Sequence, residues 1–362
     1  MKSKKILIIC TSLNMGGAER KAVWLANKMS IEHTVYFFSL KSSGILSSEF
    51  NQRVIIKNFD LVRSKNIFSK IFYIFIGWFR LKKVIKDENI TTVISFLFHS
   101  NLYAKLVKLF STSNFKHIIA VRSDRLSKRG SNQNFLRMFL FKKIIIDKKT
   151  IITFNSKAGL TKFNLNKKYN QFLIYNSPTN LPKYYENKIN RYVYVGRLDE
   201  LKNTISLVKA IKILREKNKS INLDIYGKGP DLPSLKKFVT ENMLDDQIIF
   251  KGIDSEISNH LNKYECLLLT STHEGFPNVL IEAMRAKTLC ISTKVGDAEE
   301  LLSENRGILV SGYDAESIAD SIDKLTKFDS DTRDSFIENA YRYVENNLAE
   351  EEIFLKWQEL VE

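Results

Sequence analysis

Short, continuous apolar runs recur along the chain and alternate with stretches of helical periodicity. The runs are rich in Ile, Val, Leu and Phe and are too short for buried helices, which favours strands buried on both faces. Strands that alternate with helices in this way form a parallel, doubly wound sheet, so the sequence predicts the α/β class. The predicted strands are 5–10, 35–38, 92–96, 118–121, 151–154, 172–175, 192–195, 222–226, 248–250, 265–269 and 289–293.

The segment 176–190 interrupts this alternation. It contains Pro178 and Pro182 with several Asn and Tyr residues, and a second strand–helix alternation begins directly after it. A chain of 362 residues is long enough for two or three domains at roughly 150 residues each. We therefore expect two α/β domains, residues 1–180 and residues 181–362.

The two predicted domains differ in charge. Residues 1–180 contain 32 Lys and Arg against 8 Asp and Glu, whereas residues 181–362 contain 24 against 32, within a total of +16. A net charge of +24 on the first domain favours an anionic membrane surface, a polyphosphate ligand or nucleic acid. The second domain, at −8, argues against a nucleic-acid clamp that spans the molecule, and no nucleic-acid motif is recognisable. We expect no nucleic-acid partner.

The apolar segments and the cysteines indicate a cytoplasmic chain. The run at 6–10 is too short for a secretory signal, and the run at 71–79 has nine residues where about 20 are needed to span a bilayer. Cys10, Cys266 and Cys290 each lie in a short apolar run, and their number and spacing fit neither a disulfide framework nor a zinc site. We expect buried, reduced thiols and no transmembrane helix.

The densest motif is the segment 271–284, Ser-Thr-His-Glu-Gly-Phe-Pro-Asn-Val-Leu-Ile-Glu-Ala-Met. Pro277 fits the first turn of a helix, whose free backbone N–H groups form an anion site. Glu274 precedes that helix, and Glu282 lies within its apolar run, where an unpaired carboxylate is costly to desolvate. Sugar hydroxyls would satisfy both carboxylates. The alternative is structural: a helix-capping Glu274 and a Glu282 paired with Arg285.

A second motif places two cations after the predicted strand 192–195. Arg197 and Lys202 lie there on one strand-to-helix loop, which suits a diphosphate. They would also stabilise the negative charge that grows as a phosphate leaves. A solvated loop with a surface pair to Glu200 is the alternative.

Glycine loops follow two other predicted strands. Gly16 and Gly17 lie between the first strand and a helix, where they would let a bulky ligand approach the backbone. A tight turn explains them equally well. Gly227 and Gly229 are weaker evidence, because no third glycine completes a dinucleotide fingerprint.

Together these motifs resemble family-4 glycosyltransferases of the GT-B type. The resemblance rests on Gly-Gly-Ala-Glu-Arg near the start, Val-Gly-Arg-Leu-x4-Asn, Tyr-Gly-x-Gly-Pro and the Glu-x7-Glu box, whose order and spacing match over essentially the whole chain. It implies two facing Rossmann-like domains with a cleft between them, and we expect the last helix, about 349–362, to pack back on the first. It also implies a retaining, metal-independent transfer, with the nucleotide sugar bound mainly by the second domain and the acceptor by the first.

The resemblance implies a role for each candidate residue, named here by the part of the nucleotide sugar that it would contact. These are Glu274 for the sugar hydroxyls, Arg197 and Lys202 for the diphosphate, Glu282 for the ribose, the backbone of Gly252 and Ile253 for the base, the helix start Phe276, Pro277, Asn278 and Val279 for sugar and phosphate, and Gly16 and Gly17 for the approach of the diphosphate to the first domain.

The chain departs from the family pattern in its first domain. Many members carry a His after the strand that corresponds to 118–121, whereas Arg122 or Ser123 occupies that place here, so no catalytic His is carried over. His99, just past a predicted strand end, is a candidate substitute; an ordinary helix-start His is the other reading. His99 and Arg122 are therefore candidate acceptor or sugar contacts. The glycine usual after the Glu-x7-Glu helix is also missing, with Lys287 in its region.

Two segments of the basic half, 62–86 and 135–149, interleave Lys and Arg with aromatic residues. A basic, aromatic amphipathic helix is typical of a membrane interface, where each Lys or Arg near an anionic leaflet contributes about 1 kcal/mol. We expect both segments to dock on the inner face of the cell membrane. In the alternative reading, the aromatic side chains fill the domain core and the lysines are solvated.

The sequence therefore predicts a peripheral membrane glycosyltransferase. It would move a hexose or N-acetylhexosamine from a nucleotide diphosphate sugar, UDP-linked, to a sugar hydroxyl of a polyprenyl-diphosphate-linked saccharide during bacterial O-antigen or capsule assembly. No cofactor or metal is expected. Two alternatives stay open: a nucleotide-sugar epimerase on the same fold, and a basic module that binds membrane or nucleic acid.

Overall fold

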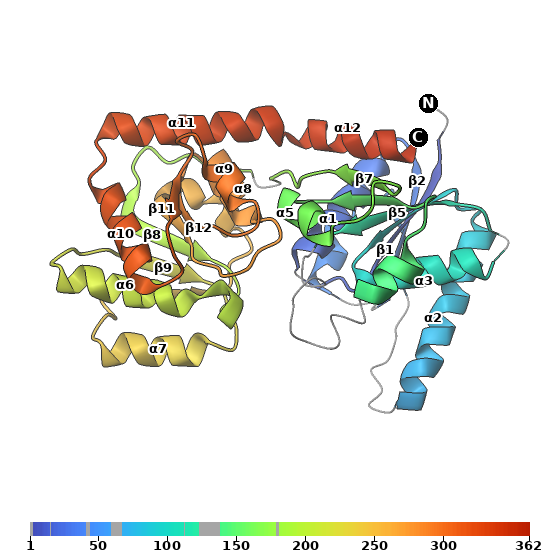
Figure 1. Ribbon diagram of the computed structural model, residues 1–362, viewed down its shortest axis with the longest axis horizontal. Helices are drawn as coiled ribbons and strands as arrows, with labels where there is room; N and C mark the ends of the chain where they lie inside the picture. Colours follow the sequence, from blue (N-terminus) through green and yellow to red (C-terminus); the bar gives the residue numbers. More distant parts are fainter. Residues whose placement is uncertain are drawn as a thin grey trace. The chain divides into compact units, whose positions relative to one another are not determined.

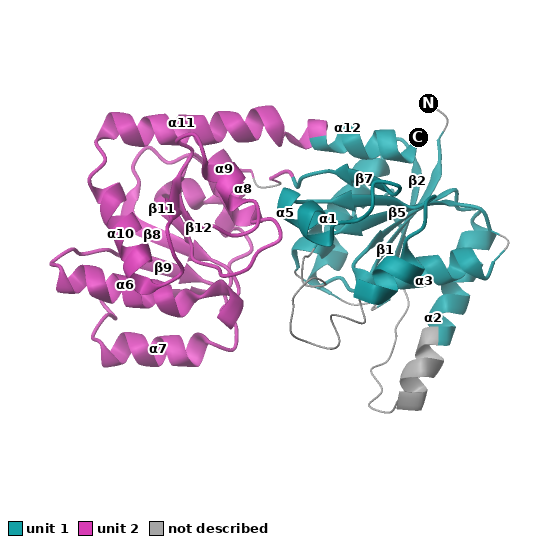
Figure 2. Ribbon diagram, in the orientation of Figure 1, with its two compact units in different colours: residues 1–176, 353–362 teal, residues 177–352 magenta. Residues whose placement is uncertain are grey.

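The computed structural model divides into two compact units (Figure 2). Unit 1 comprises residues 1–176 and 353–362, and unit 2 comprises residues 177–352. The chain therefore returns to unit 1 at its C-terminal end. The structure describes residues 3–14, 16–40, 44–58, 67–111, 113–122, 138–178 and 181–362.

Within its described residues, unit 1 is built around a seven-stranded parallel sheet (Figure 1). The strand order is β3-β2-β1-β4-β5-β6-β7. The strands are β1 (Lys5–Cys10), β2 (Thr34–Ser39), β3 (Ile55–Asn58), β4 (Thr92–Phe96), β5 (Lys116–Val121), β6 (Ile151–Phe154) and β7 (Asn170–Leu173). The helices are α1 (Gly17–Met29), α2 (Ile67–Asp87), α3 (Phe98–Leu109), α5 (Lys157–Phe163) and α12 (Glu350–Val361), with a 3-10 turn at Ile45–Glu49 and a π turn at Phe141–Ile145.

Both faces of the unit 1 sheet are buried by helices. Successive side chains of a strand point to opposite faces, so Ile6 and Ile8 of β1 pack with α1 and α12 while Leu7 and Ile9 pack with α2 and α3. Burial on two faces explains why the strands read as continuous apolar runs. Trp357 of α12 is fully buried in this core, which fixes the last helix on unit 1.

Across residues 181–352, unit 2 has a six-stranded parallel sheet in the order β10-β9-β8-β11-β12-β13. The strands are β8 (Ile189–Val195), β9 (Leu223–Tyr226), β10 (Ile248–Gly252), β11 (Tyr264–Leu269), β12 (Leu289–Thr293) and β13 (Ile308–Val310). The helices are α6 (Thr204–Glu216), α7 (Leu232–Glu241), α8 (Asn278–Arg285), α9 (Ala298–Leu302), α10 (Ala315–Thr326) and α11 (Ser330–Asn347), with short turns at Glu200–Lys202, Ile257–Asn259 and Leu261–Lys263. Helices α6, α7 and α10 cover one face, while α8 and α9 contact β11 and β12.

Each sheet reverses its strand order once. The reversal lies between β1 and β4 in unit 1 and between β8 and β11 in unit 2. In open α/β sheets, ligands bind at the carboxyl ends of the strands beside such a switch point. The topology therefore predicts ligand binding at the loops after β8 and β11 in unit 2, and at those after β1 and β4 in unit 1.

The predicted α/β class and the parallel, doubly wound sheets are confirmed. Each predicted strand is present, with end shifts of one to three residues in several of them. The strands β3 and β13 were missed, and both lie at the edges of their sheets. Ile55 and Ile56 of β3 are 40% and 37% exposed beside Lys57, and β13 has only three residues. Partial exposure in β3 and the three-residue length of β13 leave neither with the long apolar run that marks a strand buried on both faces.

The two basic, aromatic segments differ in structure. Helix α2 is described from Ile67 onward, so 62–66 of the first segment and 135–137 of the second lie outside the described residues. The second segment is not a long amphipathic helix in its described part, because it is helical at 138–140 and then forms the π turn Phe141–Ile145, with both end residues of that turn buried.

Helix α2 is amphipathic where its side chains are described. Leu81 and Ile85 are buried against the core, whereas Phe75 and Phe79, on another face, are 58% and 60% exposed. These two aromatic side chains do not fill the domain core. Among the described residues, no helix has both the length and the apolar character needed to cross a membrane.

Candidate functional site

The loops that follow β8 and β11 lie together at the switch point of unit 2. Because the two strands are parallel neighbours, their carboxyl ends meet at one edge of the sheet. The backbone N–H of Thr272 donates to the carbonyl of Leu201 at 2.9 Å, and Thr270 Oγ1 donates to the carbonyl of Lys202 at 3.2 Å. These bonds join the two loops that carry most of the predicted donor-binding residues.

Lys202 and Glu274 form an ion pair across these loops. Lys202 Nζ donates to Glu274 Oε1, and Ser271 Oγ donates to the same oxygen at 2.8 Å. The Lys202 and Glu274 side chains are 25% and 14% exposed, so solvent screens the pair less than it screens a surface ion pair. The structure thus brings the first carboxylate of the Glu-x7-Glu box to a cation of the second motif.

Arg197 is the more exposed of the two predicted cations. Its side chain is 56% exposed, and its guanidinium pairs with Asp199, not with Glu200 as in the solvated-loop reading. The second oxygen of that carboxylate, Asp199 Oδ1, is buried without a partner among the described residues. Arg197 therefore lies beside a carboxylate that the sequence reasoning did not assign, and most of its side chain is accessible to a ligand.

Glu282 lies on α8 and is held from a different element. Ser258 Oγ, in the turn Ile257–Asn259, donates to Glu282 Oε2 at 2.7 Å. Arg285, the partner in the structural alternative, places its Nε 3.4 Å from Glu345 Oε1 and donates from Nη1 to the carbonyl of Pro178 at 3.3 Å. Sequence reasoning missed Ser258, because nothing in its local pattern links it to a residue 24 positions later.

The start of α8 differs by one residue from the sequence expectation. Pro277 is the residue before the helix, which begins at Asn278, so Pro277 is not in its first turn. The backbone N–H of Asn278 donates to the carbonyl of Phe276 at 3.0 Å, and Phe276 is buried. The N–H of Asn278 is therefore already engaged in a local turn, and Val279 follows directly in the first turn of α8.

Gly252 is the last residue of β10, and Ile253 follows it at the same edge of the sheet. Gly252 has a φ of +76°, a Cβ there would meet nothing within 4 Å, and Ile253 is 53% exposed. The carbonyl of Gly252 accepts a hydrogen bond from the N–H of Gly227 at 2.6 Å. β10 is three strands from β11, roughly 14 Å at the usual strand spacing, so the candidate residues spread along an edge long enough for an elongated ligand.

Several glycines at this edge are required by close backbone packing. A Cβ on Gly227 would lie 1.8 Å from the carbonyl oxygen of Gly196, and one on Gly229 would lie 2.0 Å from that of Leu198. The Gly-x-Gly sequence is therefore a turn that packs on the loop after β8. Gly296, after β12, has a φ of +53°, and its Cβ would lie 2.5 Å from the carbonyl oxygen of Gly275. Sequence reasoning did not single out Gly296.

The switch point of unit 1 carries different chemistry. Thr11, after β1, and Ser100, on α3 after β4, place their hydroxyl oxygens 3.3 Å apart. His99 is exposed in the first turn of α3, as the helix-start reading predicted, and its place beside this edge leaves its contact role a prediction. Leu97, the residue before α3, has a φ of 71°. Backbone strain of this kind concentrates at binding sites and switch regions.

Gly16 forms the start of α1 in this unit. A Cβ on Gly16 would lie 2.3 Å from Glu19 Oε2, because the Glu19 carboxylate folds back over the helix start. Ser12 Oγ donates to Glu19 Oε1 at 3.4 Å. These contacts favour the tight-turn reading for Gly16, and Gly17 is the first residue of the helix.

Arg122 follows β5 and points into unit 1. Its Nη1 donates to the carbonyl of Ile174 at 3.1 Å and to Asn176 Oδ1 at 3.4 Å, and its guanidinium carbon lies 5.7 Å from the ring centre of Phe96 and 5.1 Å from that of Trp357. Burial lowers the pKa of the Arg122 guanidinium to about 9. These contacts connect the end of β5 to α12, and whether Arg122 also contacts a sugar stays a prediction.

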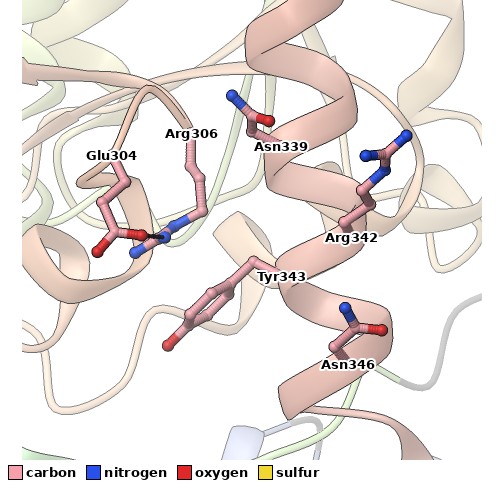
Figure 3. A pocket seen from close by; sticks show the side chains of 6 residues that line it. All are labelled: Glu304, Arg306, Asn339, Arg342, Tyr343 and Asn346. Carbon is pink, nitrogen blue, oxygen red and sulfur yellow. Dashed lines mark hydrogen bonds and ion pairs between the residues drawn. The ribbon is translucent and has the colours of Figure 1, made fainter.

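A separate hollow lies between the loop before β13 and α11 of unit 2 (Figure 3). Its volume is about 260 Å³, and its lining residues are Glu304, Arg306, Asn339, Arg342, Tyr343 and Asn346. Arg306 donates to the carbonyls of Glu300 and Leu301 at 2.7 and 2.9 Å, and its guanidinium carbon lies 4.1 Å from the centre of the Tyr343 ring. Arg306 thus caps the end of α9, and the hollow contains none of the predicted site residues.

Comparison with known proteins places unit 2 in a family. Residues 177–343 match the family described as glycosyl transferases group 1. The whole chain is similar to a Campylobacter jejuni GalNAc-alpha-(1->4)-GalNAc-alpha-(1->3)-diNAcBac-PP-undecaprenol alpha-1,4-N-acetyl-D-galactosaminyltransferase, with 27% identity over 93% of this chain and 92% of the relative. It is also similar to the Escherichia coli O-antigen biosynthesis glycosyltransferase WbnH, with 26% identity over 85% of this chain and 90% of the relative.

Solved structures share the fold over the whole chain. A glycosyltransferase from Rickettsia africae has a TM-score of 0.81 at 20% identity and covers 100% of this chain and 98% of its own. Anabaena HepE, solved in complex with UDP and glucose, has a TM-score of 0.82 at 16% identity and covers 98% of each chain. The family match and these relatives confirm the resemblance drawn from the motifs. The chain carries a glycosyl transferases group 1 domain and is a glycosyltransferase of the GT-B fold.

Proposed function

We propose that this glycosyltransferase moves a hexose or N-acetylhexosamine from a UDP-linked sugar to a sugar hydroxyl of a polyprenyl-diphosphate-linked saccharide, with retention of anomeric configuration. The observation that carries the proposal is the cluster of Lys202, Glu274 and Ser271 at the switch point of unit 2. The relatives support the class of acceptor and the pathway, because one is named for an undecaprenol-linked saccharide and the other for O-antigen biosynthesis.

The donor occupies the edge of unit 2 in this proposal. Glu274 holds hydroxyls of the sugar, because its carboxylate is a strong acceptor for O–H donors. An ammonium group has three N–H donors, so Lys202 pairs with Glu274 and still has donors for the diphosphate. Arg197 is exposed enough to reach the same group. As the glycosidic bond breaks, both cations stabilise the charge that grows on the leaving diphosphate.

The nucleoside lies along the same edge. Glu282, oriented by Ser258, accepts from the ribose hydroxyls, and the exposed backbone at Gly252 and Ile253 frames the base. The start of α8, from Phe276 to Val279, lies between the sugar and the phosphates. These roles follow from the family resemblance and from the spread of the residues along the carboxyl ends of β8, β10 and β11.

The acceptor is membrane-bound in this proposal, and α2 docks on the anionic cytoplasmic leaflet. Phe75 and Phe79 are exposed one helical turn apart, and Lys83 and Lys86 are exposed on the same helix. Apolar side chains flanked by cations favour binding at an anionic lipid interface. The inner face of the cell membrane is then the site of action.

A transfer assay tests this function directly. A panel of nucleotide sugars is screened by thermal shift, and each stabilising sugar is then incubated with an undecaprenyl-diphosphate-linked oligosaccharide. Glu274→Ala should abolish transfer. Glu265→Ala, which removes a carboxylate paired with Arg333 elsewhere in unit 2, should retain it. Turnover by Glu274→Ala near the wild-type rate would overturn the role of that carboxylate.

The product's anomeric centre tests the stereochemistry. Retention gives a product with the same anomeric configuration as the sugar had in the donor, which NMR coupling constants identify. A product of the opposite anomeric configuration would contradict a retaining transfer. Incubation of the protein with a nucleotide sugar and no acceptor tests the epimerase alternative. An epimerised nucleotide sugar as the product would show an epimerase and would contradict the proposed transfer.

A further inference from the structure

One oxygen of Glu274 receives two donors from different parts of unit 2. Lys202 Nζ comes from the loop after β8, and Ser271 Oγ comes from the loop after β11; both donate to Oε1. Among the described residues, no side chain or backbone group donates to the other oxygen, Oε2. The carboxylate therefore has one engaged oxygen and one available oxygen.

Two donors on one oxygen restrict the rotation of the carboxylate. The terminal torsion of a glutamate is broad and roughly two-fold, so one hydrogen bond leaves the carboxylate plane loosely defined. A cation and a hydroxyl that approach Oε1 from two elements limit that freedom, and charge-assisted bonds of this kind are the strong ones. Oε2 then points in a defined direction.

Ser271 is itself rigidly placed. It has no exposed surface, and its carbonyl accepts a hydrogen bond from Thr293 Oγ1 of β12 at 2.6 Å. The next strand thus fixes the backbone from which the Ser271 hydroxyl reaches Glu274. The backbone of Gly296 packs closely on that of Glu274, because a Cβ on Gly296 would lie 3.0 Å from the Glu274 carbonyl oxygen.

We propose that Ser271 is a positioning residue, whose hydroxyl holds Glu274 Oε1 so that Oε2 meets the hydroxyl groups of the donor sugar. The proposal rests on the proposed function, since it takes Glu274 as the sugar-binding carboxylate. Ser271 does not touch the donor. Its contribution is confined to the sugar part of the nucleotide sugar, and it does not affect the nucleotide part.

Two probes separate these parts: UDP, and UDP-N-acetylgalactosamine, whose sugar is the one named in the Campylobacter relative. Calorimetric titration gives the affinity of the full chain for each. Ser271→Ala should weaken UDP-N-acetylgalactosamine about tenfold, as expected for a lost hydrogen bond to a charged group, and leave UDP within about twofold. Ser271→Thr, which restores the hydroxyl, should recover the sugar-dependent affinity.

Ser292 provides a matched control. It is a serine of β12 with no exposed surface, and its Oγ donates to the carbonyl of the adjacent Thr293 at 2.8 Å, away from Glu274. Ser292→Ala makes the same chemical change at the same burial and should leave both affinities unchanged. A purely structural role for Ser271 would weaken UDP and UDP-N-acetylgalactosamine equally, and that result would overturn the proposal.

Glu274→Gln separates a failure of the Ser271 proposal from a failure of the proposed function. If Glu274→Gln loses the sugar-dependent affinity while Ser271→Ala keeps it, the positioning role of Ser271 is wrong and the proposed function stands. If Glu274→Gln itself keeps that affinity, the sugar-binding role of Glu274 fails, and with it the part of the proposed function on which Ser271 depends.

Discussion

The two units share one sheet topology but carry different chemistry at their switch points. In unit 2, an ion pair between Lys202 and Glu274 joins the loops after the two strands that flank the reversal. In unit 1, the corresponding contact joins two neutral hydroxyls, those of Thr11 and Ser100. Glu19, a carboxylate in the first turn of the helix after β1, folds back on the start of that helix and, among the described residues, does not pair across to the loop after β4.

This difference shows that the net charge of a domain does not predict which charged groups lie at its switch point. Residues 1–180 carry the whole excess of basic residues, yet the ion pair between Lys202 and Glu274 lies in the mildly acidic second half. A diphosphate needs fixed cations at one point, whereas a membrane surface is recognised by many mobile cations spread over a face. The comparison is therefore consistent with the proposal that unit 2 binds the donor and unit 1 the membrane-bound acceptor.

Breaking the ion pair of unit 2 should have the largest effect. Lys202→Met and Glu274→Gln should each lower kcat/KM by about 100- to 1000-fold, because each removes a fixed charge from the transition state. The double variant should be no worse than the more damaging single one, since the two groups act as a unit. Steady-state kinetics of the four proteins measure this coupling.

The hydroxyl pair of unit 1 is the control for that experiment. Thr11→Val with Ser100→Ala removes one neutral contact and should lower kcat/KM by less than about tenfold. A larger loss of kcat/KM from the unit 1 variant than from the unit 2 variants would contradict this ranking of the two switch points. Additive effects of the Lys202 and Glu274 substitutions would show that the two groups do not act as a unit.

Acid should destabilise unit 1 through His117. This side chain of β5 is fully buried, with Nε2 2.9 Å from Ser95 Oγ, and burial lowers its pKa to about 3. Between its unfolded pKa, about 6.5, and the folded value, the unfolded chain binds a proton that the folded chain does not, so stability falls as pH falls. From pH 7 to pH 5 the loss is about 2 kcal/mol.

Urea unfolding at the two pH values measures this term in unit 1 alone. The three tryptophans, Trp24, Trp78 and Trp357, all lie in unit 1, so their fluorescence reports on that unit. His117→Gln keeps a hydrogen-bonding side chain for Ser95 without a titrating group. Between pH 7 and pH 5, this variant should therefore lose about 2 kcal/mol less unfolding free energy than the wild-type protein. An equal pH dependence in both proteins would show that His117 contributes nothing.

Vesicle binding sharpens the assignment of the membrane to unit 1. Phe75→Ser with Phe79→Ser removes two exposed aromatic side chains of α2 and should weaken sedimentation with phosphatidylglycerol vesicles by about tenfold. Met243→Ser, at an apolar residue of unit 2 that is 76% exposed, should leave binding unchanged. Unaltered vesicle binding by the α2 variant would contradict membrane docking through this face of α2.

A backbone substitution in unit 2 should have the smallest effect. Lys287 follows α8 with a φ of 54°, the conformation that glycine usually supplies at a helix end. Its side chain lies 3.3 Å from Glu338 Oε2 and 4.5 Å from the ring centre of Tyr341. Lys287→Gly relieves the backbone and loses these contacts, so the free energy of unfolding should change by less than about 1 kcal/mol. Circular dichroism during urea unfolding measures it, and a larger loss would show that the side chain anchors α8 to α11.

How well the sequence predicted a strand depended on the burial and the length of that strand. β1, β4, β6 and β12 match their predicted bounds, and each is an inner strand that reads as a largely apolar run because both of its faces are covered. β3 is partly exposed on both faces and contains Lys57, and β13 has only three residues, so the sequence pattern predicted neither strand.

The sequence predicted the charged residues of the site but not the residues that pair with them. The Glu-x7-Glu spacing marked Glu274 and Glu282, but the hydroxyls that hold them belong to Ser271 and Ser258, whose roles depend on tertiary contacts. The pairing of Arg197 with Asp199 was likewise a choice among neighbouring carboxylates. A single sequence identifies groups that need partners, whereas the folded chain decides which partners they receive.

Hydrogen exchange of the full chain with and without UDP-N-acetylgalactosamine tests the central claim most directly. The account predicts that the ligand slows amide exchange in 196–203 and 270–279, the loops after β8 and β11 that contain Arg197, Lys202 and Glu274. Protection confined to other segments by a bound ligand, with these two loops exchanging at their free rates, would contradict it.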